Sequence, residues 1–254
     1  MKFNAQTEIK KIISFIQDYF NKNNLDGVVI GISGGKDSTI VSSLFAKALG
    51  PENVIGINMP CQSLKEDETD AKRVADHIGF QLYNFDLTKI FEIHEEGLNK
   101  TFNFDKKKIK EAAVNLKPRL RMSSLYYVAQ GLSIQNNKNY IVAGTSNKCE
   151  IYVGYFTKFG DGASDINVLA DLTVSEVLAI GDALGLPKDL VHKPPADGLS
   201  GKTDEERLGF TYQQVEEVIK GNLEHERITH LHRVTSHKRR AITIYKGSET
   251  DEEN

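Results

Sequence analysis

Cysteine, proline and long apolar runs are scarce in this 254-residue chain. The two cysteines, Cys61 and Cys149, lie far apart, which argues against a disulfide framework or a cysteine-based zinc site and predicts free thiols in a reducing cytosol. The 20 glycines and 6 prolines are too few for a collagen-like or low-complexity chain. No apolar run approaches the roughly 20 residues that span a bilayer, and the N-terminus lacks a secretory signal. We therefore expect a cytoplasmic protein that does not bind to membranes.

A large excess of charge of either sign is also missing. The chain has 32 basic and 35 acidic residues, so its net charge of −3 provides no long-range attraction for nucleic acid. Any anion site must therefore be local. Apolar residues make up 39% of the chain, enough to fill a core, which argues against a disordered protein. The length fits one large α/β domain or two small ones.

Strand and helix patterns alternate through the first 145 residues. Apolar residues at helical spacing predict helices, and short apolar runs before turns predict buried strands. The alternation predicts an α/β fold, a doubly wound parallel sheet with helices on both faces. The predicted strands are 28–32, 53–59, 81–87, 140–143 and the strand-like 166–169. The predicted helices are 5–23, 38–49, 66–78, a polar stretch at 88–116, 119–132, 173–184 and three short stretches within 203–237, with a proline-rich break at 187–195.

The domain organisation follows from what interrupts this pattern. No internal repeat or linker is visible, so we expect a single domain over residues 1–245. The acidic, polar residues 246–254 are expected to form a disordered tail.

The strongest local signal is GISGGKDS at residues 31–38, directly after the first predicted strand. Its glycines allow a tight turn that points successive N–H groups at one place, and the following helix adds its positive N-terminal end. Asp37 beside bound phosphates makes sense mainly if a divalent cation bridges them. The Walker pattern fails, because Ile30 stands where its first glycine belongs, and the dinucleotide pattern fails at Ser33. The sequence therefore predicts a phosphate site of another kind.

This loop resembles the pyrophosphate-binding loop of the ATP pyrophosphatases, which include NAD, GMP, asparagine and argininosuccinate synthetases and tRNA-thiolating enzymes. The resemblance implies ATP that is cleaved between its α and β phosphates. A substrate oxygen is adenylated, and a nucleophile then displaces AMP. The loop alone does not choose among these enzymes.

A second string makes the choice. TKFGDG at 157–162 with DIN at 165–167 closely resembles the signature of the ammonia-dependent NAD synthetase family. Further matches follow in family order from about residue 8 to 241. They are NLKPRLRM at 115–122, GTSNKCE at 144–150, Asp204-Glu205, Leu208-Gly209 and His237-Lys238-Arg239.

The resemblance implies a homodimer that converts deamido-NAD, ATP and ammonia into NAD, AMP and pyrophosphate. Magnesium would be held by Asp37 and Glu150, and the catalytic residues would be Asp37, Lys158 and Asp165. The implied ATP site is Gly31, Ile32, Ser33, Gly34, Gly35, Lys36, Asp37, Ser38 and Thr145. The implied deamido-NAD contacts are Arg119, Arg121, Lys158, Asp165, His237 and Lys238.

Residue chemistry agrees with these implied roles. Adenylation joins two anions, and magnesium with lysine and arginine side chains would offset their repulsion. Asp165 is a hypothetical selector of ammonium that would take up a proton. Arg119 and Arg121 are two apart and point differently from a helix, so we expect one of them to reach substrate. The motifs fill the chain, and a glutamine-hydrolysing domain would need well over about 100 further residues, so we expect the nitrogen source to be free or delivered ammonia.

The match departs from the family pattern at three positions. Val174 stands where the family has a lysine that contacts ATP, Pro195 replaces a threonine or serine that contacts ATP, and Val168 replaces a proline. Lys193 or Lys202 would be the compensating cation. Two alternatives therefore stay open. The chain is either another ATP pyrophosphatase, or a diverged paralogue that binds nucleotide without catalysis.

Overall fold

A five-stranded parallel sheet forms the centre of the molecule. The computed structural model describes residues 3–63, 65–193 and 203–245. The strand order is β3-β2-β1-β4-β5, so the chain moves outward from β1 to β3 and then returns to the other side of β1. This topology confirms the predicted doubly wound sheet and places its switch point between β1 and β4. The strands span Gly27–Gly31 (β1), Val54–Asn58 (β2), Gln81–Asn84 (β3), Tyr140–Gly144 (β4) and Ile166–Asn167 (β5).

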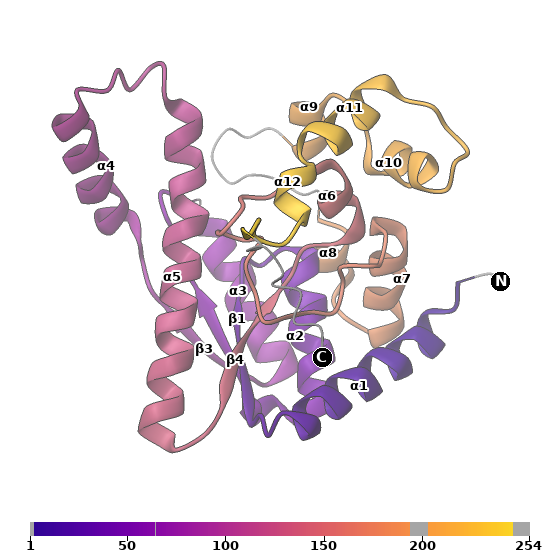
Figure 1. The fold of residues 1–254 in the computed structure, drawn as a ribbon. Coiled ribbons are helices and arrows are strands. Elements are labelled where there is room, and N and C mark those ends of the chain that lie inside the picture. Colours follow the sequence, from indigo (N-terminus) through magenta and orange to yellow (C-terminus); the bar gives the residue numbers. More distant parts are fainter. Residues whose placement is uncertain (1–2, 64, 194–202, 246–254) are drawn as a thin grey trace, which may run out of the picture.

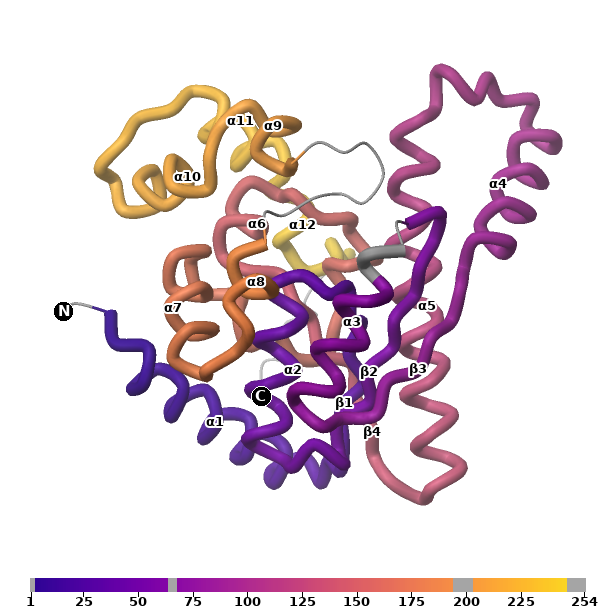
Figure 2. The backbone as a smooth tube through the Cα atoms, turned by 180° about the vertical axis from the view of Figure 1, so that it is seen from behind, coloured from indigo at the N-terminus to yellow at the C-terminus, as the bar shows by residue number. Residues whose placement is uncertain are grey.

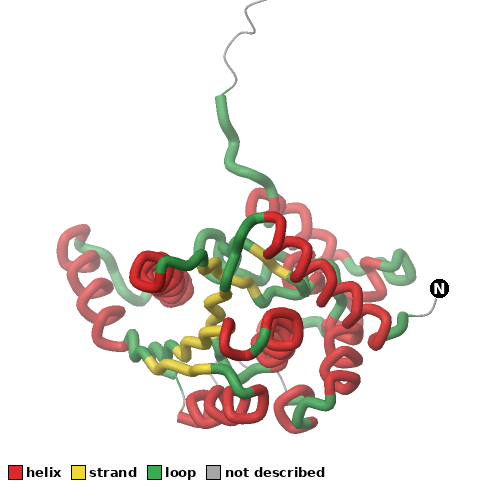
Figure 3. Tube along the Cα trace, turned by 90° about the horizontal axis from the view of Figure 1, so that it is seen from below, coloured by secondary structure: helices red, strands yellow, loops and turns green. Residues whose placement is uncertain are grey.

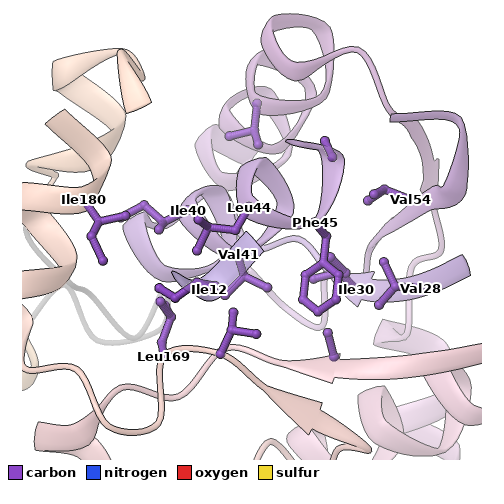
Figure 4. Packing of buried hydrophobic residues seen from close by; sticks show 14 of the residues in the cluster. Ile12, Val28, Ile30, Ile40, Val41, Leu44, Phe45, Val54, Leu169 and Ile180 are labelled. Atoms are coloured by element: carbon purple, nitrogen blue, oxygen red, sulfur yellow. The ribbon is translucent and has the colours of Figure 1, made fainter. Parts of the chain in front are cut away.

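Helices cover both faces of the sheet, because alternate residues of each central strand enter two different apolar clusters. Val28 and Ile30 of β1 pack with Phe45 in the larger cluster (Figure 4), whereas Val29 packs with Ile57 in the second. Strands that are buried on both faces read as continuous apolar runs, as the sequence predicted. The first face carries α1 (Ala5–Lys22), α2 (Lys36–Leu49), α3 (Lys65–Ile78), α7 (Val174–Leu184) and α8 (Lys188–Val191). The second face carries α4 (Thr88–Phe102) and α5 (Lys110–Asn136), and the 3-10 helix η1 (Pro51–Asn53) leads into β2.

The C-terminal helices form a smaller unit around α6, which directly follows β4. Cys149 and Val153 of α6 pack with Phe210, Val215 and Ile228 in a third apolar cluster. Figures 1 and 2 show these helices gathered beside α6, at the end of the sheet where β4 finishes. This placement brings residues after 203 close to the loops that follow β1 and β4. The helices are α6 (Lys148–Val153), α9 (Asp204–Leu208), α10 (Tyr212–Ile219), α11 (Glu226–Val234) and α12 (Ser236–Arg239).

The helix bounds differ most from the prediction around Pro118. The sequence placed the boundary between two helices there, because an interior proline removes one helical hydrogen bond. In the structure the chain instead leaves the helix at 103–109, and Pro118 lies inside α5. The first turns of α5 are held by tertiary contact, since Thr157 Oγ1 donates a 2.6 Å hydrogen bond to Asn115 Oδ1. Packing of this kind offsets the local cost of the proline.

Other expectations have mixed outcomes. Within 203–245, four short helices stand where three were predicted, and the break at 187–195 contains α8. Both cysteines are free and buried, as expected. None of the helices within the described ranges has the length and apolar character needed to cross a membrane. The predicted tail at 246–254, Pro195 and Lys202 lie outside the described residues.

Candidate active site

The loop between β1 and α2 presents the amino end of a 14-residue helix. Gly34 has φ of 78°, a conformation that favours glycine, and it turns the chain into the helix. Gly35 is the N-cap and has no side chain to cap the first helical N–H groups, which stay directed at the loop. The hydroxyls of Ser33 and Ser38 lie 3.2 Å apart, and Ser38 donates to Gly35 O at 3.1 Å. These bonds hold the loop in the shape of an anion site.

Acidic and basic groups meet beside this loop. Lys36 Nζ donates to Asp37 Oδ2 at 2.8 Å, and Asn147 Nδ2 donates to Asp37 Oδ1 at 3.3 Å. Glu150 caps α6, since its Oε2 accepts from the backbone N–H of Asn147 at 3.0 Å. Withdrawal from water and the nearby Asp37 carboxylate raise the pKa of Glu150 above its ordinary value. Two carboxylates are thus held close together against their mutual repulsion, an arrangement that suits a divalent cation.

A pocket of about 420 Å³ opens at the carboxyl ends of the strands. Its walls come from the segments after β1, β2 and β4, together with α5 and the loop that contains Gly160 and Asp161. In doubly wound sheets, ligands bind at this edge and beside the switch point. The predicted site residues that line the pocket are Gly31, Ile32, Ser33, Gly35, Lys36, Asp37, Arg121, Thr145 and Glu150. Gly34 and Ser38 are buried within the phosphate loop itself.

The two predicted arginines point in different directions, as their spacing in α5 suggested. Arg121 lines the pocket, and its Nε donates to Met59 O at 3.0 Å. Arg119 is exposed, and its Nη2 lies 3.4 Å from Lys158 O. The structure therefore brings Arg121 to the pocket and leaves Arg119 with the loop outside it.

The other predicted contacts form a separate group, which we call the rim. The rim consists of Arg119, Lys158, Asp165, His237 and Lys238, none of which is among the described residues that line the pocket. Lys158 Nζ donates to His237 O at 2.8 Å. Lys238 Nζ donates to two carbonyls of the 154–165 loop, Gly154 O at 2.7 Å and Phe156 O at 2.6 Å. The rim lysines thus tie α12 to this loop.

Asp165, the fifth rim residue, directly precedes β5 and is bonded to β4. Its Oδ2 accepts from the backbone N–H of Val142 at 2.8 Å, and its Oδ1 accepts from Tyr126 Oη at 3.2 Å. Asp161 lines the pocket, whereas Asp165 is not among the described residues that line it. Asp161 Oδ1 accepts a hydrogen bond from the backbone N–H of Thr157 at 2.9 Å. Sequence reasoning quoted Asp161 within its motif and gave it no role.

Asp204 also had no assigned role in the sequence, and the structure places it below the phosphate loop. It is buried, with Tyr155 Oη at 3.1 Å from Oδ1 and Tyr212 Oη at 3.4 Å from Oδ2. The ring of Tyr212 lies 5.9 Å from Lys36 Nζ. The C-terminal helices therefore contribute to the surroundings of the buried Lys36. The signal that could have found Asp204 was its position at the start of a capped helix in a matching motif.

Val174, the main departure from the family pattern, begins α7 and packs against the third apolar cluster. It is absent from the pocket wall within the ranges the structure describes. Lys193 does line the pocket, as does Glu68 of α3. Of the two lysines considered as replacements, Lys193 is thus the one that the structure places at the site.

The sheet topology and the anion loop at its switch point define an α/β nucleotide-binding protein. The chain belongs to the NAD synthase family, whose model matches residues 8–251. A protein of Carboxydothermus hydrogenoformans described as NH(3)-dependent NAD(+) synthetase is 38% identical over 220 residues, which cover 86% of this chain and 87% of that protein.

Two solved structures are also similar over nearly the whole chain. The NMN synthetase from Francisella tularensis has a TM-score of 0.86 and 33% identity, and the match covers 97% of this chain and all of that one. The NH3-dependent NAD synthetase from Campylobacter jejuni has a TM-score of 0.74 and 27% identity, with 96% of this chain and all of that one covered. Both likenesses span the phosphate loop, the pocket and the rim.

Proposed function

We propose that this protein amidates deamido-NAD with ammonia, using ATP and releasing NAD, AMP and pyrophosphate. One observation carries the proposal: a member of the NAD synthase family has its anion loop, paired carboxylates and Arg121 on the wall of one pocket. Relatives that are named NH(3)-dependent NAD(+) synthetase support the same reaction. Another ATP pyrophosphatase or a non-catalytic paralogue is not favoured by these relatives.

ATP would bind with its phosphates on the loop at 31–38 and with Thr145 at the far side of the switch point. The free N–H groups at the start of α2 suit phosphate oxygens. Asp37 and Glu150 would hold Mg²⁺, and their closeness supports this assignment, because a cation would offset the burial and the repulsion from Asp37 that raise the pKa of Glu150. The ion would supply a Lewis acid that withdraws charge from the departing pyrophosphate.

Deamido-NAD would approach from α5 and the rim. Arg121 is the cation on the pocket wall that suits a planar carboxylate or a phosphate of this substrate. Arg119, Lys158, His237 and Lys238 would bind the more distant phosphates, because the positive charges of Arg119, Lys158 and Lys238 lie between α5 and α12. The chain's own residues thus orient two anions toward each other, and ammonia completes the reaction without a covalent nucleophile.

Ammonium would be bound by a carboxylate near the end of β4. Asp165 was the candidate from the sequence, and its two oxygens already accept from Val142 N and Tyr126 Oη. Asp161 lines the pocket, and its Oδ1 accepts a hydrogen bond from Thr157 N at 2.9 Å. We therefore propose Asp161 as the residue that takes the proton from ammonium, with Asp165 holding the edge of β4.

A second substrate is favoured by one specific observation. The NMN synthetase structure matches this chain with a higher TM-score than the NAD synthetase from Campylobacter jejuni. Both reactions convert a nicotinate carboxylate into an amide, and they differ in whether an adenylate half is attached. The second candidate is therefore amidation of the mononucleotide in the same pocket.

We also propose that the protein is a homodimer in the cytoplasm. Large apolar side chains are exposed along α4 and α5. These two helices lie at one side of the molecule (Figure 1), and the same side is seen from below in Figure 3. Tyr127, Ile134 and Ile93 are 79%, 78% and 72% exposed. Apolar surface of this kind marks a contact with a second copy. The assembly is tested by light scattering: Tyr127→Glu should give monomers if this face is the interface, and an unchanged dimer would exclude it.

The activity is tested by incubating the protein with Mg-ATP, ammonium and either deamido-NAD or the nicotinate mononucleotide. We expect NAD and AMP in equal amounts from the dinucleotide. A larger kcat/KM with the mononucleotide would favour the second candidate. If no AMP forms with either compound, both candidates are wrong.

A further inference from the structure

Lys193 is a cation on the pocket wall that the proposed ATP, magnesium and deamido-NAD sites do not include, although the sequence named it as one of two lysines that could compensate for Val174. It follows α8 by two residues and lines the same pocket as Lys36, Asp37 and Glu150. Its side chain is 32% exposed.

A chain of charged groups holds Lys193 over the pocket. Its Nζ lies 2.7 Å from Oδ2 of Asp70 on α3, and the other oxygen of Asp70 is 3.1 Å from Arg73 Nη1. Arg73 Nη2 in turn lies 2.6 Å from Asp189 Oδ2 on α8. This chain of ion pairs ties α3 to α8 and fixes the segment from which Lys193 projects.

The charge of the pocket wall favours a further cation there, in addition to the Mg²⁺ that Asp37 and Glu150 would hold. Four acidic residues on the wall face three basic ones, and Lys36 is already paired with Asp37 at 2.8 Å. A triphosphate would add several more negative charges to a partly desolvated space, where repulsion between charges is stronger than in water. The basic residues on the wall are Lys36, Arg121 and Lys193, and the acidic residues are Asp37, Glu68, Glu150 and Asp161.

The position of Lys193 indicates which part of a ligand it meets. Helices α3 and α8 both pack against α2, whose amino end forms the phosphate loop. Lys193 therefore flanks this loop from the α3–α8 side, while Glu150 flanks it from α6. A lysine has a flexible stem with a mobile point charge, so its ammonium can move between acceptors without a backbone change.

We propose that Lys193 binds the phosphate chain of ATP, exchanging its ion pair with Asp70 for phosphate oxygens. The proposal rests on the proposed function only in that ATP is the nucleotide used. Asp70 acts through Lys193, as a positioning residue that holds the ammonium near the phosphate loop until ATP arrives.

The test compares Lys193→Met and Lys193→Arg with Lys72→Met. Lys72 is an exposed lysine of α3 whose partner, Asp76, lies away from the pocket. The dissociation constant for Mg-ATP is measured by calorimetry, and KM is measured for ATP and for deamido-NAD. We expect Lys193→Met to weaken ATP binding about 10- to 100-fold, as for loss of one charge-assisted hydrogen bond. KM for deamido-NAD should change less than about twofold, Lys193→Arg should keep most of the affinity, and Lys72→Met should match the wild type.

Product inhibition provides a second readout that does not need turnover to be fast. Pyrophosphate should inhibit Lys193→Met less strongly than the wild type, whereas inhibition by AMP should be unchanged. If the wild type binds ATP and Lys193→Met binds it equally well, the proposal is wrong. It is also wrong if the variant loses affinity for deamido-NAD alone. A wild type that makes no amide product while its ATP binding still depends on Lys193 would overturn the proposed function and leave this inference standing.

Discussion

The phosphate loop and the rim, which we propose as two anion-binding regions, are built in different ways. The loop uses backbone N–H groups of one helix end, and its hydroxyls bond to one another within residues 33–38. The rim uses long lysine side chains that cross to distant carbonyls, from Lys158 to His237 and from Lys238 to Gly154. The loop is therefore built before ligand binds, whereas the rim lysines must exchange protein acceptors for substrate.

The largest effect is expected at the carboxylates beside the loop. Asp37→Asn keeps the size of the side chain and removes the charge that would bind Mg²⁺, so kcat should fall by about 10²–10³-fold. The rate of AMP formation measures this effect, and the melting temperature checks the fold. Asp76→Asn, an exposed change on α3, serves as the control. Activity within about tenfold of the wild type would mean that the loop does not depend on the charge of Asp37.

Arg121 and Arg119 allow the pocket and the rim to be compared within one helix, α5, because Arg121 lines the pocket and Arg119 belongs to the rim. Arg121→Met should raise KM for the nicotinate substrate by about 10- to 100-fold, because it removes a cation from the pocket wall. Arg119→Met, its matched control two residues away, should raise KM by less than about fivefold, because an exposed contact contributes little. Initial rates at saturating ATP measure both. A larger increase in KM for Arg119→Met than for Arg121→Met would show that the nicotinate substrate binds outside the pocket.

The rim lysines should matter less for activity and more for local stability. Lys238→Met leaves the carbonyls of Gly154 and Phe156 without their donor and should lower the free energy of unfolding by about 2 kcal/mol. Lys158→Met removes one bond at a more accessible site and should cost less than about 1 kcal/mol. Urea unfolding of the two variants gives the comparison. Equal losses would show that the rim is held by something other than these bonds.

The smallest effect is expected where Asp165 meets α5. Tyr126→Phe removes one of the two donors to Asp165 and leaves the bond from Val142 N. If Asp161 receives the proton from ammonium, KM for ammonium should change less than about threefold in this variant, because the lost hydrogen bond is to Asp165 and not to the group that binds ammonium. Tyr127→Phe at the exposed neighbouring position is the control. A change above about tenfold would return the ammonium site to Asp165.

Local signals account for what the sequence predicted correctly. The phosphate loop is contained in eight residues, and the parallel sheet follows from strands buried on both faces, so both were visible without the structure. The composition of the pocket wall was harder to predict from the sequence, because Asp161 and Lys193 reach it through packing between segments far apart in the chain. Pro118 shows the same limit, since tertiary contacts keep α5 continuous where the local rule predicts a break.

Transfer of an oxygen atom tests the proposed chemistry most directly. The nicotinate carboxylate of the substrate is labelled with ¹⁸O, and the AMP formed with Mg-ATP and ammonium is analysed by mass spectrometry. Adenylation of the carboxylate at the pocket predicts that AMP gains one labelled oxygen for each amide formed, while pyrophosphate gains none. Unlabelled AMP, or label in pyrophosphate or inorganic phosphate, would contradict the assignment of this pocket to an adenylating amidation.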